Sequence, residues 1–347
     1  VLQIPEATLK LQWTPFVRKR FVLERFTISD TEVIVKELED GNWQIGGITL
    51  AGEKEPAEPS AWDFGLQQVT IQNSVIKLVS SQLTSEVKIE QAQVSKMTSW
   101  MPESSARLEF TGQLNGANLG LQMDVSPFGS EIAASGRIGL QGLPLDPFVP
   151  LLQPHLKTLE GRLDIDVNID TRLNADGGLN HHQKGSVKLH QIRTRMADMN
   201  LAKESLVWNG AIRVNIGESS KALKIITDGQ LNGSGLKLEI ENENLAVQQK
   251  NFSWKGKIDF KQDKTRQDLK ADGQIGLADL KIESPQFSLT EEKLTWQGPV
   301  QVSSTAGTEG QGIIADGMLS GDHLQVDLPG RKLKVEHRGL LWKGRLD

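Results

Sequence analysis

Cysteine is absent from this chain, and so are tyrosine and long apolar runs. The lack of cysteine excludes disulfide bonds, thiolate metal sites and a cysteine nucleophile. No run reaches the roughly 18 apolar residues that a membrane-spanning helix needs, so the sequence predicts no such helix. A basic excess is also missing, because the net charge is -5, and this excludes the charge pattern typical of nucleic-acid binding.

Helical periodicity is scarce as well. The one stretch that shows it, Leu145 to Leu159, contains three prolines and therefore predicts at most one short, broken helix. The charged stretch from Glu53 to Pro59 contains two further prolines, and residues 51–61 are therefore expected to form an exposed loop.

Motifs of known catalytic chemistry are lacking too. The sequence holds no glycine loop of the phosphate-binding kind, no His-Glu-x-x-His pair and no Gly-x-Ser-x-Gly segment. Carboxylates are plentiful, but they fall on the polar side of alternating segments, as Asp164 and Asp166 do, where nothing marks a shielded pocket. We therefore expect a protein that is not an enzyme and that has no cofactor and no metal site.

Alternation of apolar and polar residues is the dominant pattern. From Leu163 to Asp170 every odd position is apolar and every even position is polar. In a strand this places the apolar side chains on one face and the charges on the other, and sheets with one wet face are antiparallel. The apolar residues of such segments are the candidates for lining an apolar groove: Leu163, Ile165, Val167, Ile169, Val187, Leu189, Leu236, Leu238, Ile240, Leu280, Ile282, Leu324, Val326 and Leu328.

Turn-forming pairs of residues are spread along the chain between the alternating segments. Each of them favours a tight hairpin, because glycine and asparagine tolerate the left-handed backbone of such turns. They are Asp40-Gly41, Asn115-Gly116, Asp176-Gly177-Gly178, Asp228-Gly229, Asn232-Gly233, Asp272-Gly273 and Asp316-Gly317.

A repeat is visible within the sequence itself. Trp-x-Gly recurs at Trp208, Trp254, Trp296 and Trp342, at spacings of 46, 42 and 46 residues, and the segment Phe26–Asp30 returns at 69–73, offset by 43. At roughly eleven residues per strand and turn, a period near 44 predicts a repeat of about four strands. The recurring tryptophan either fills the same corner of each repeat or belongs to a ladder along which an apolar ligand slides.

Two architectures use strand repeats of this length. A propeller packs its blades on both sides, which fits poorly with the clean polar face. Its blades often end in Trp-Asp, whereas the recurring Trp here is followed by Asn, Lys or Gln and then Gly. We therefore expect an all-β fold: an elongated antiparallel repeat sheet curled into an open groove, with one short broken helix near 145–159. The same pattern also allows the sheet to close on itself around a dry core.

Two segments resemble the AsmA-like superfamily, including its TamB- and YhdP-related members. They are Phe21 to Val35, followed by Asp40-Gly-Asn-Trp-Gln-Ile45, and Ser135 to Val149, running on to Leu159-Glu-Gly-Arg-Leu-Asp164. The resemblance implies a periplasmic β-groove protein of Gram-negative bacteria, similar to bridge-like lipid-transfer proteins. It implies inner-membrane tethering by an N-terminal helix, which this chain lacks, so we expect a fragment or a processed form.

The resemblance also sets the expected organisation and function. Residues 1–50 are expected to form an AsmA-like N-terminal β segment, 62–144 β-groove repeats, 145–160 a short helical interruption and 161–347 further repeats with the Trp-x-Gly period. The expected function is a conduit that carries phospholipid acyl chains along an apolar groove between inner and outer membrane, with membrane-protein partners at its ends and no nucleic acid.

Two other functions stay open at this stage. One is a structural or assembly scaffold for outer-membrane biogenesis, with a closed dry core and partners on its outer face. The other is a carrier for lipopolysaccharide, which would favour cationic residues near the rim of the groove. Lys and Arg are scattered along this chain rather than banded.

Overall fold

The computed structural model describes residues 2–3, 5–38, 41–50, 62–153, 155–217, 222–305 and 311–346. Strands dominate it, which confirms the expected all-β class. The strands are β1 (Leu2–Gln3), β2 (Glu6–Gln12), β3 (Arg20–Ser29), β4 (Glu32–Glu37), β5 (Trp43–Ile45), β6 (Ile48–Leu50), β7 (Asp63–Val79), β8 (Thr84–Thr98), β9 (Ala106–Leu114), β10 (Ala117–Ser126), β11 (Glu131–Pro144), β12 (Thr158–Asn174), β13 (Leu179–Arg195), β14 (Met199–Ile216), β15 (Leu223–Ile240), β16 (Leu245–Gln262), β17 (Arg266–Glu283), β18 (Ser288–Thr305), β19 (Gln311–Leu328) and β20 (Leu333–Leu346).

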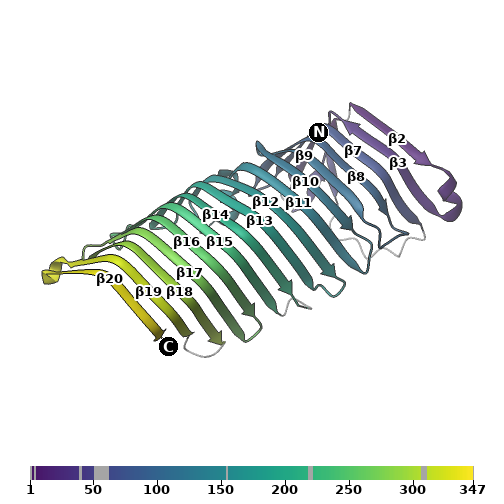
Figure 1. Ribbon diagram of the computed structural model, residues 1–347. Coiled ribbons are helices and arrows are strands. Elements are labelled where there is room, and N and C mark those ends of the chain that lie inside the picture. The colour runs from purple at the N-terminus through teal and green to yellow at the C-terminus, as the bar shows by residue number, and fades with distance from the viewer. Residues whose placement is uncertain are drawn as a thin grey trace. The chain divides into compact units, whose positions relative to one another are not determined.

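The chain forms two units. The first holds residues 1–151 and 164–175, and the second holds residues 152–163 and 176–347, so that β12 contributes to both. In the second unit, β13 to β20 follow one another in chain order, each antiparallel to the next (Figure 1). The sheet is open and does not close into a barrel, which confirms the groove-like fold class.

The first unit departs from purely antiparallel pairing at its beginning. Strand β7 pairs in parallel with β3 and then with β4, whereas its pairing with β8 is antiparallel. The sequence echo offset by 43 residues is this parallel pair: Phe26 lies opposite Val69 and Ile28 opposite Ile71. The echo therefore marks two neighbouring strands, because residues at equal places in parallel strands share the same surroundings.

Each period of about 44 residues holds two long strands, and the expectation of four strands was wrong. From β14 to β19 every strand has 18 residues. Of the turn signals, Asn115-Gly116 and Asp176 to Gly178 do lie between strands, whereas Gly229, Gly233, Gly273 and Gly317 lie inside β15, β17 and β19. A glycine inside a strand marks close approach of another group rather than a turn.

A bend within each strand from β13 to β20 explains why the sequence predicted four strands per period instead of two. The pairing register of the second unit skips one line of residues, here called the corner row: Gln191, Glu204, Gly235, Lys250, Asp279, Glu292, Asp322 and Gly339. Gln191, Gly235, Asp279 and Gly339 have positive φ. Figure 1 shows that the long strands of this unit bend along their length. The bend shifts the alternation by one residue, so a continuous strand reads in the sequence as two.

In the part of the chain that the structure describes, three short 3-10 helices interrupt the strands. Helix η2 (Asp146–Leu152), with Pro150 inside it, confirms the expected broken helix, and η1 (Thr14–Arg18) and η4 (Pro329–Arg331) were not predicted. The expected loop at 51–61 lies outside the described residues. Among the described residues, no helix has the length and apolar character needed to cross a membrane.

Candidate functional site

The candidate site is the apolar side of the bent sheet in the second unit, here called the inner face. It carries the tryptophans of Trp-x-Gly, and it lies on the inside of the bend. Gln249 and Glu291, which flank the corner on this side, are 5% and 2% exposed, whereas Glu204, Lys250 and Asp279 of the corner row are exposed. A bend crowds the side chains on its inside and spreads those on its outside.

One line of aliphatic residues crosses seven neighbouring strands of the inner face. Register partners link each member to the next, so the side chains form a continuous strip at the strand spacing of about 4.8 Å. This aliphatic row comprises Leu201, Leu238, Val247, Ile282, Leu289, Val326 and Val335. Val335 is 44% exposed, and the other members are half-buried.

The structure brings eight of the fourteen candidate residues together at this row. Leu238, Ile282 and Val326 belong to it, and Leu236, Leu280 and Leu324 lie between it and the corner, while Ile240 and Leu328 lie on its other side.

The other six candidates lie elsewhere. Val187 and Leu189 lie beyond the corner, opposite Trp208 and Leu206. Leu163 belongs to the second unit, and Ile165, Val167 and Ile169 belong to the first.

Beyond the corner, tryptophan and glycine form two parallel rows. The tryptophan row comprises Val187, Trp208, Leu231, Trp254, Ile275, Trp296, Leu319 and Trp342, and the glycine row comprises Gly185, Gly210, Gly229, Gly256, Gly273, Gly298, Gly317 and Gly344.

The tryptophan rings lie over the glycines. A Cβ added at Gly210 would lie 2.8 Å from Cζ2 of Trp208, and one at Gly229 would lie 2.9 Å from Cη2 of the same ring. Trp-x-Gly is therefore a structural contact, in which an indole covers the backbone that the glycines expose. This supports the interpretation that the recurring tryptophan fills the same corner of each repeat.

A polar position recurs at the bottom of the bend. It is occupied by Lys203, Gln249, Glu291 and His337, each five residues before a Trp of Trp-x-Gly, while the strands between them carry Leu236, Leu280 and Leu324. Lys203 extends over Gly233, where an added Cβ would lie 2.9 Å from its ammonium. Burial lowers the pKa of Lys203, opposed by the nearby charge of Glu204. The sequence did not identify these polar residues as part of the inner face, because the alternation of apolar and polar residues shifts by one residue at the corner.

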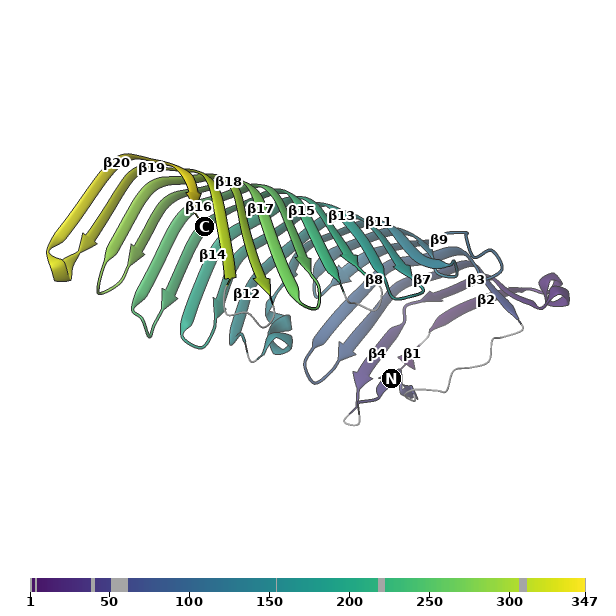
Figure 2. The ribbon, with the colours of Figure 1, turned by 90° about the horizontal axis from the view of Figure 1, so that it is seen from below.

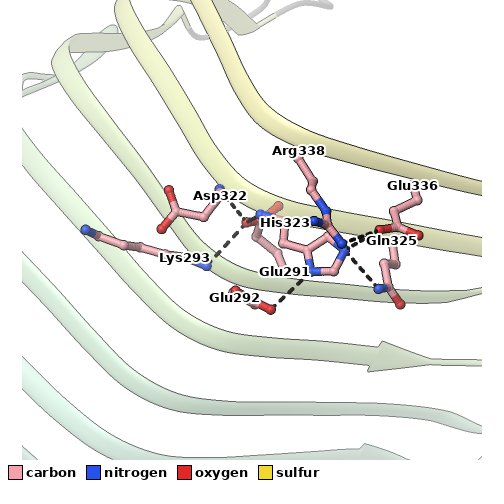
Figure 3. A network of polar contacts seen from close by, with 8 residues as sticks. All are labelled: Glu291, Glu292, Lys293, Asp322, His323, Gln325, Glu336 and Arg338. Carbon is pink, nitrogen blue, oxygen red and sulfur yellow. Dashed lines mark hydrogen bonds and ion pairs between the residues drawn. The ribbon is translucent and has the colours of Figure 1, made fainter.

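Glu291 closes the bend between β18 and β19. Its Oε1 accepts hydrogen bonds from the backbone N–H groups of Asp322 at 2.9 Å, His323 at 3.0 Å and Lys293 at 3.3 Å (Figure 3). Its Oε2 is buried without a partner and lies beside Gly321. The carboxylate thus satisfies backbone donors that the strand pairing leaves free at the corner.

The opposite, outer face is charged. His323 of β19 lies there between two carboxylates, with Nδ1 3.1 Å from Glu292 of β18 and Nε2 2.9 Å from Glu336 of β20 (Figure 3). These two hydrogen bonds raise the pKa of His323. Charged side chains therefore gather on the outer, solvated face, and the inner face carries few of them.

Within the second unit, the described residues form no second layer over the inner face. The chain exposes 21909 Å², whereas a compact monomer of this mass exposes about 14,000 Å². Among the described residues of the second unit, the one buried apolar residue is Trp254, at 7% exposure. The apolar surface is therefore left available to water or to a ligand.

A hollow of about 500 Å³ lies beside the corner of the second unit. Its lining combines small hydroxyl and amide side chains, such as Ser205 and Asn232, with the apolar side chains of Val207, Phe252 and Leu277. Polar groups therefore interrupt the apolar surface of this hollow, whereas the aliphatic row is apolar throughout.

Comparison with known proteins returned no match among protein-family models, curated proteins or solved structures.

Proposed function

We propose that the inner face binds the acyl chains of phospholipids and that the chain acts as a non-enzymatic lipid-transfer conduit. The observation that carries the proposal is the aliphatic row, which continues in register across seven strands and stays half-exposed. Water covers such a surface poorly, and each methylene buried against it stabilises the complex by about 0.8 kcal/mol.

Transport would be passive. Acyl chains slide along the row because neighbouring strands offer nearly equivalent apolar contacts, while the head groups remain in water beyond the rim. No covalent step is required. The resemblance to the AsmA-like superfamily supports placing this conduit in the periplasm, tethered to the inner membrane and directed towards the outer membrane, with phospholipid and both membranes as partners.

The open sheet favours this function over the scaffold. A scaffold with a dry core would bury its aliphatic residues, yet Leu238, Ile282 and Val326 are half-buried in a sheet that does not close into a barrel. The inner face also lacks the cationic residues that a carrier of lipopolysaccharide would favour: Lys203 is the one lysine or arginine among the inner-face residues of β14 to β20 that the structure describes.

Charge placed in the aliphatic row tests the proposal. We expect Leu238→Asp to weaken binding of a fluorescent fatty acid roughly 50-fold, because about three methylene contacts are lost at 0.8 kcal/mol each. The matched control is Lys237→Asp, one residue away on the outer face, where binding should not change. Equal binding by wild type and Leu238→Asp, with both folded by circular dichroism, would count against the conduit.

A further inference from the structure

The first unit ends in an exposed group of aromatic and apolar residues, here called the aromatic tip: Trp13, Phe16, Val17, Phe21, Trp62 and Phe64. Two of these residues, Phe16 and Val17, belong to helix η1, which forms the turn between β2 and β3 (Figure 2). Val17 is 91% exposed and Trp13 is 72% exposed. Turns in water are normally built from Gly, Pro, Asn, Asp and Ser, so an exposed valine and tryptophan need a partner.

The rings of the tip support one another. Phe16 lies at its centre, with ring centroids 5.5 Å from Trp13, 5.9 Å from Phe21 and 5.8 Å from Trp62. Pro15 lies in the first turn of η1, and Lys19, directly after η1, has the left-handed conformation, which together fix the turn. The exposed apolar surface is therefore held in place before any partner arrives, so little ordering cost accompanies its burial.

Basic residues border the aromatic tip. Arg18 and Lys19 are exposed at the end of η1, and neither has a carboxylate partner among the described residues. Arg20 follows directly and lies over the ring of Trp100, with its guanidinium carbon 4.8 Å from the ring centroid. Tryptophan beside unpaired basic residues is typical of the boundary between a bilayer and water, where indole rings sit at head-group level and cations meet anionic lipids.

The tip also adjoins an apolar path along the sheet of its own unit. Phe21 of β3 lies opposite Phe64 of β7, with the rings stacked at 6.3 Å. The next apolar partners along the two strands are Leu23 with Leu66, followed by Phe26 with Val69. A hydrocarbon chain held at the tip would therefore meet apolar side chains continuously as it moved along β3 and β7.

We propose that the aromatic tip is a membrane-docking surface that places Trp13 and Val17 in the interface of a bilayer containing anionic lipids. This surface is separable from the acyl-binding row, because it uses other residues and lies in the other unit. The two proposals can therefore fail independently.

A single label tests the docking. Because the chain has no cysteine, Val17→Cys provides one thiol for an environment-sensitive nitrobenzoxadiazole label. We expect the fluorescence to rise and shift to the blue with vesicles of phosphatidylcholine and phosphatidylglycerol, and much less with phosphatidylcholine alone. The matched control is Leu341→Cys, at a 67% exposed apolar residue of the second unit, which should show no shift.

The basic residues are tested in the same labelled protein. Replacing Arg18 and Lys19 by serine should weaken binding to the anionic vesicles roughly 30-fold, since each basic residue near a membrane surface contributes about 1 kcal/mol. Added salt should weaken wild-type binding in the same direction.

Three outcomes would overturn the docking surface. They are the absence of a shift at Val17→Cys with either vesicle, an equal shift at Leu341→Cys, and a shift without vesicles that grows with protein concentration, which would mean that a second copy covers the tip. Vesicle flotation and fatty-acid uptake, measured for the unlabelled wild type and for Trp13→Ser, separate the two proposals. Normal uptake with lost flotation in Trp13→Ser supports docking. A wild-type protein that floats with the vesicles, while Trp13→Ser does not, but that takes up no fatty acid overturns only the conduit.

Discussion

Single polar residues at the bottom of the bend illustrate how one position serves different purposes. Lys203, Gln249 and Glu291 occupy the same place in successive repeats, and leucine stands there on the strands between them. Glu291 accepts three backbone N–H groups, whereas Lys203 extends over Gly233 without a carboxylate partner among the described residues. Glutamate therefore supports the fold at its site, and lysine does not.

Replacing each of the two by leucine separates these roles. Glu291→Leu should destabilise the protein by about 2 kcal/mol, because buried backbone donors lose their acceptor. Lys203→Leu should leave stability unchanged or raise it, because the burial that lowers the pKa of Lys203 would then carry no cost. Urea unfolding followed by tryptophan fluorescence measures both. Equal losses in the two variants would contradict the assigned roles.

At the scale of the element, the strand of 18 residues with a bend is the building block of the second unit. Its faces were predictable from the sequence on each side of the bend, since Leu236, Leu238 and Ile240 alternate cleanly. The length of the strand was not predictable, because the alternation shifts by one residue at the corner. In addition, the Asp-Gly pairs inside β15, β17 and β19 have the sequence pattern of turns. The glycines are explained by contacts across strands, which no local pattern reveals.

The glycine row provides a test at this scale. A Cβ at Gly256 would lie 2.7 Å from Cα of Gly273 and 3.0 Å from the ring of Trp254, so Gly256→Ala should destabilise by about 2 kcal/mol. At Gly120 in β10 an added Cβ meets nothing within 4 Å, and Gly120→Ala should stabilise by about 0.5 kcal/mol through the unfolded chain. Thermal unfolding compares the two, and similar melting temperatures would refute the indole-over-glycine contact.

At the scale of the whole molecule, the sequence predicted the all-β class, the open antiparallel sheet and the helix near 145–159. It did not predict the parallel pairing of β7 with β3 and β4, because the 43-residue echo looked like one more repeat. It also did not predict the aromatic tip, whose residues come from 13–21 and 62–64 and meet only when those strands pair. Eight groove candidates do gather at the aliphatic row, and their role in binding lipid stays a prediction.

The measurement that tests the central claim most directly is native mass spectrometry, with solvent extraction, of the chain purified from a Gram-negative host. An open aliphatic row across seven strands should retain phospholipid, so we expect several bound molecules per chain in the wild type. The Leu238→Asp variant should retain fewer. Lipid-free protein that also takes up no fluorescent fatty acid would contradict the conduit and would support a scaffold that acts through its charged outer face.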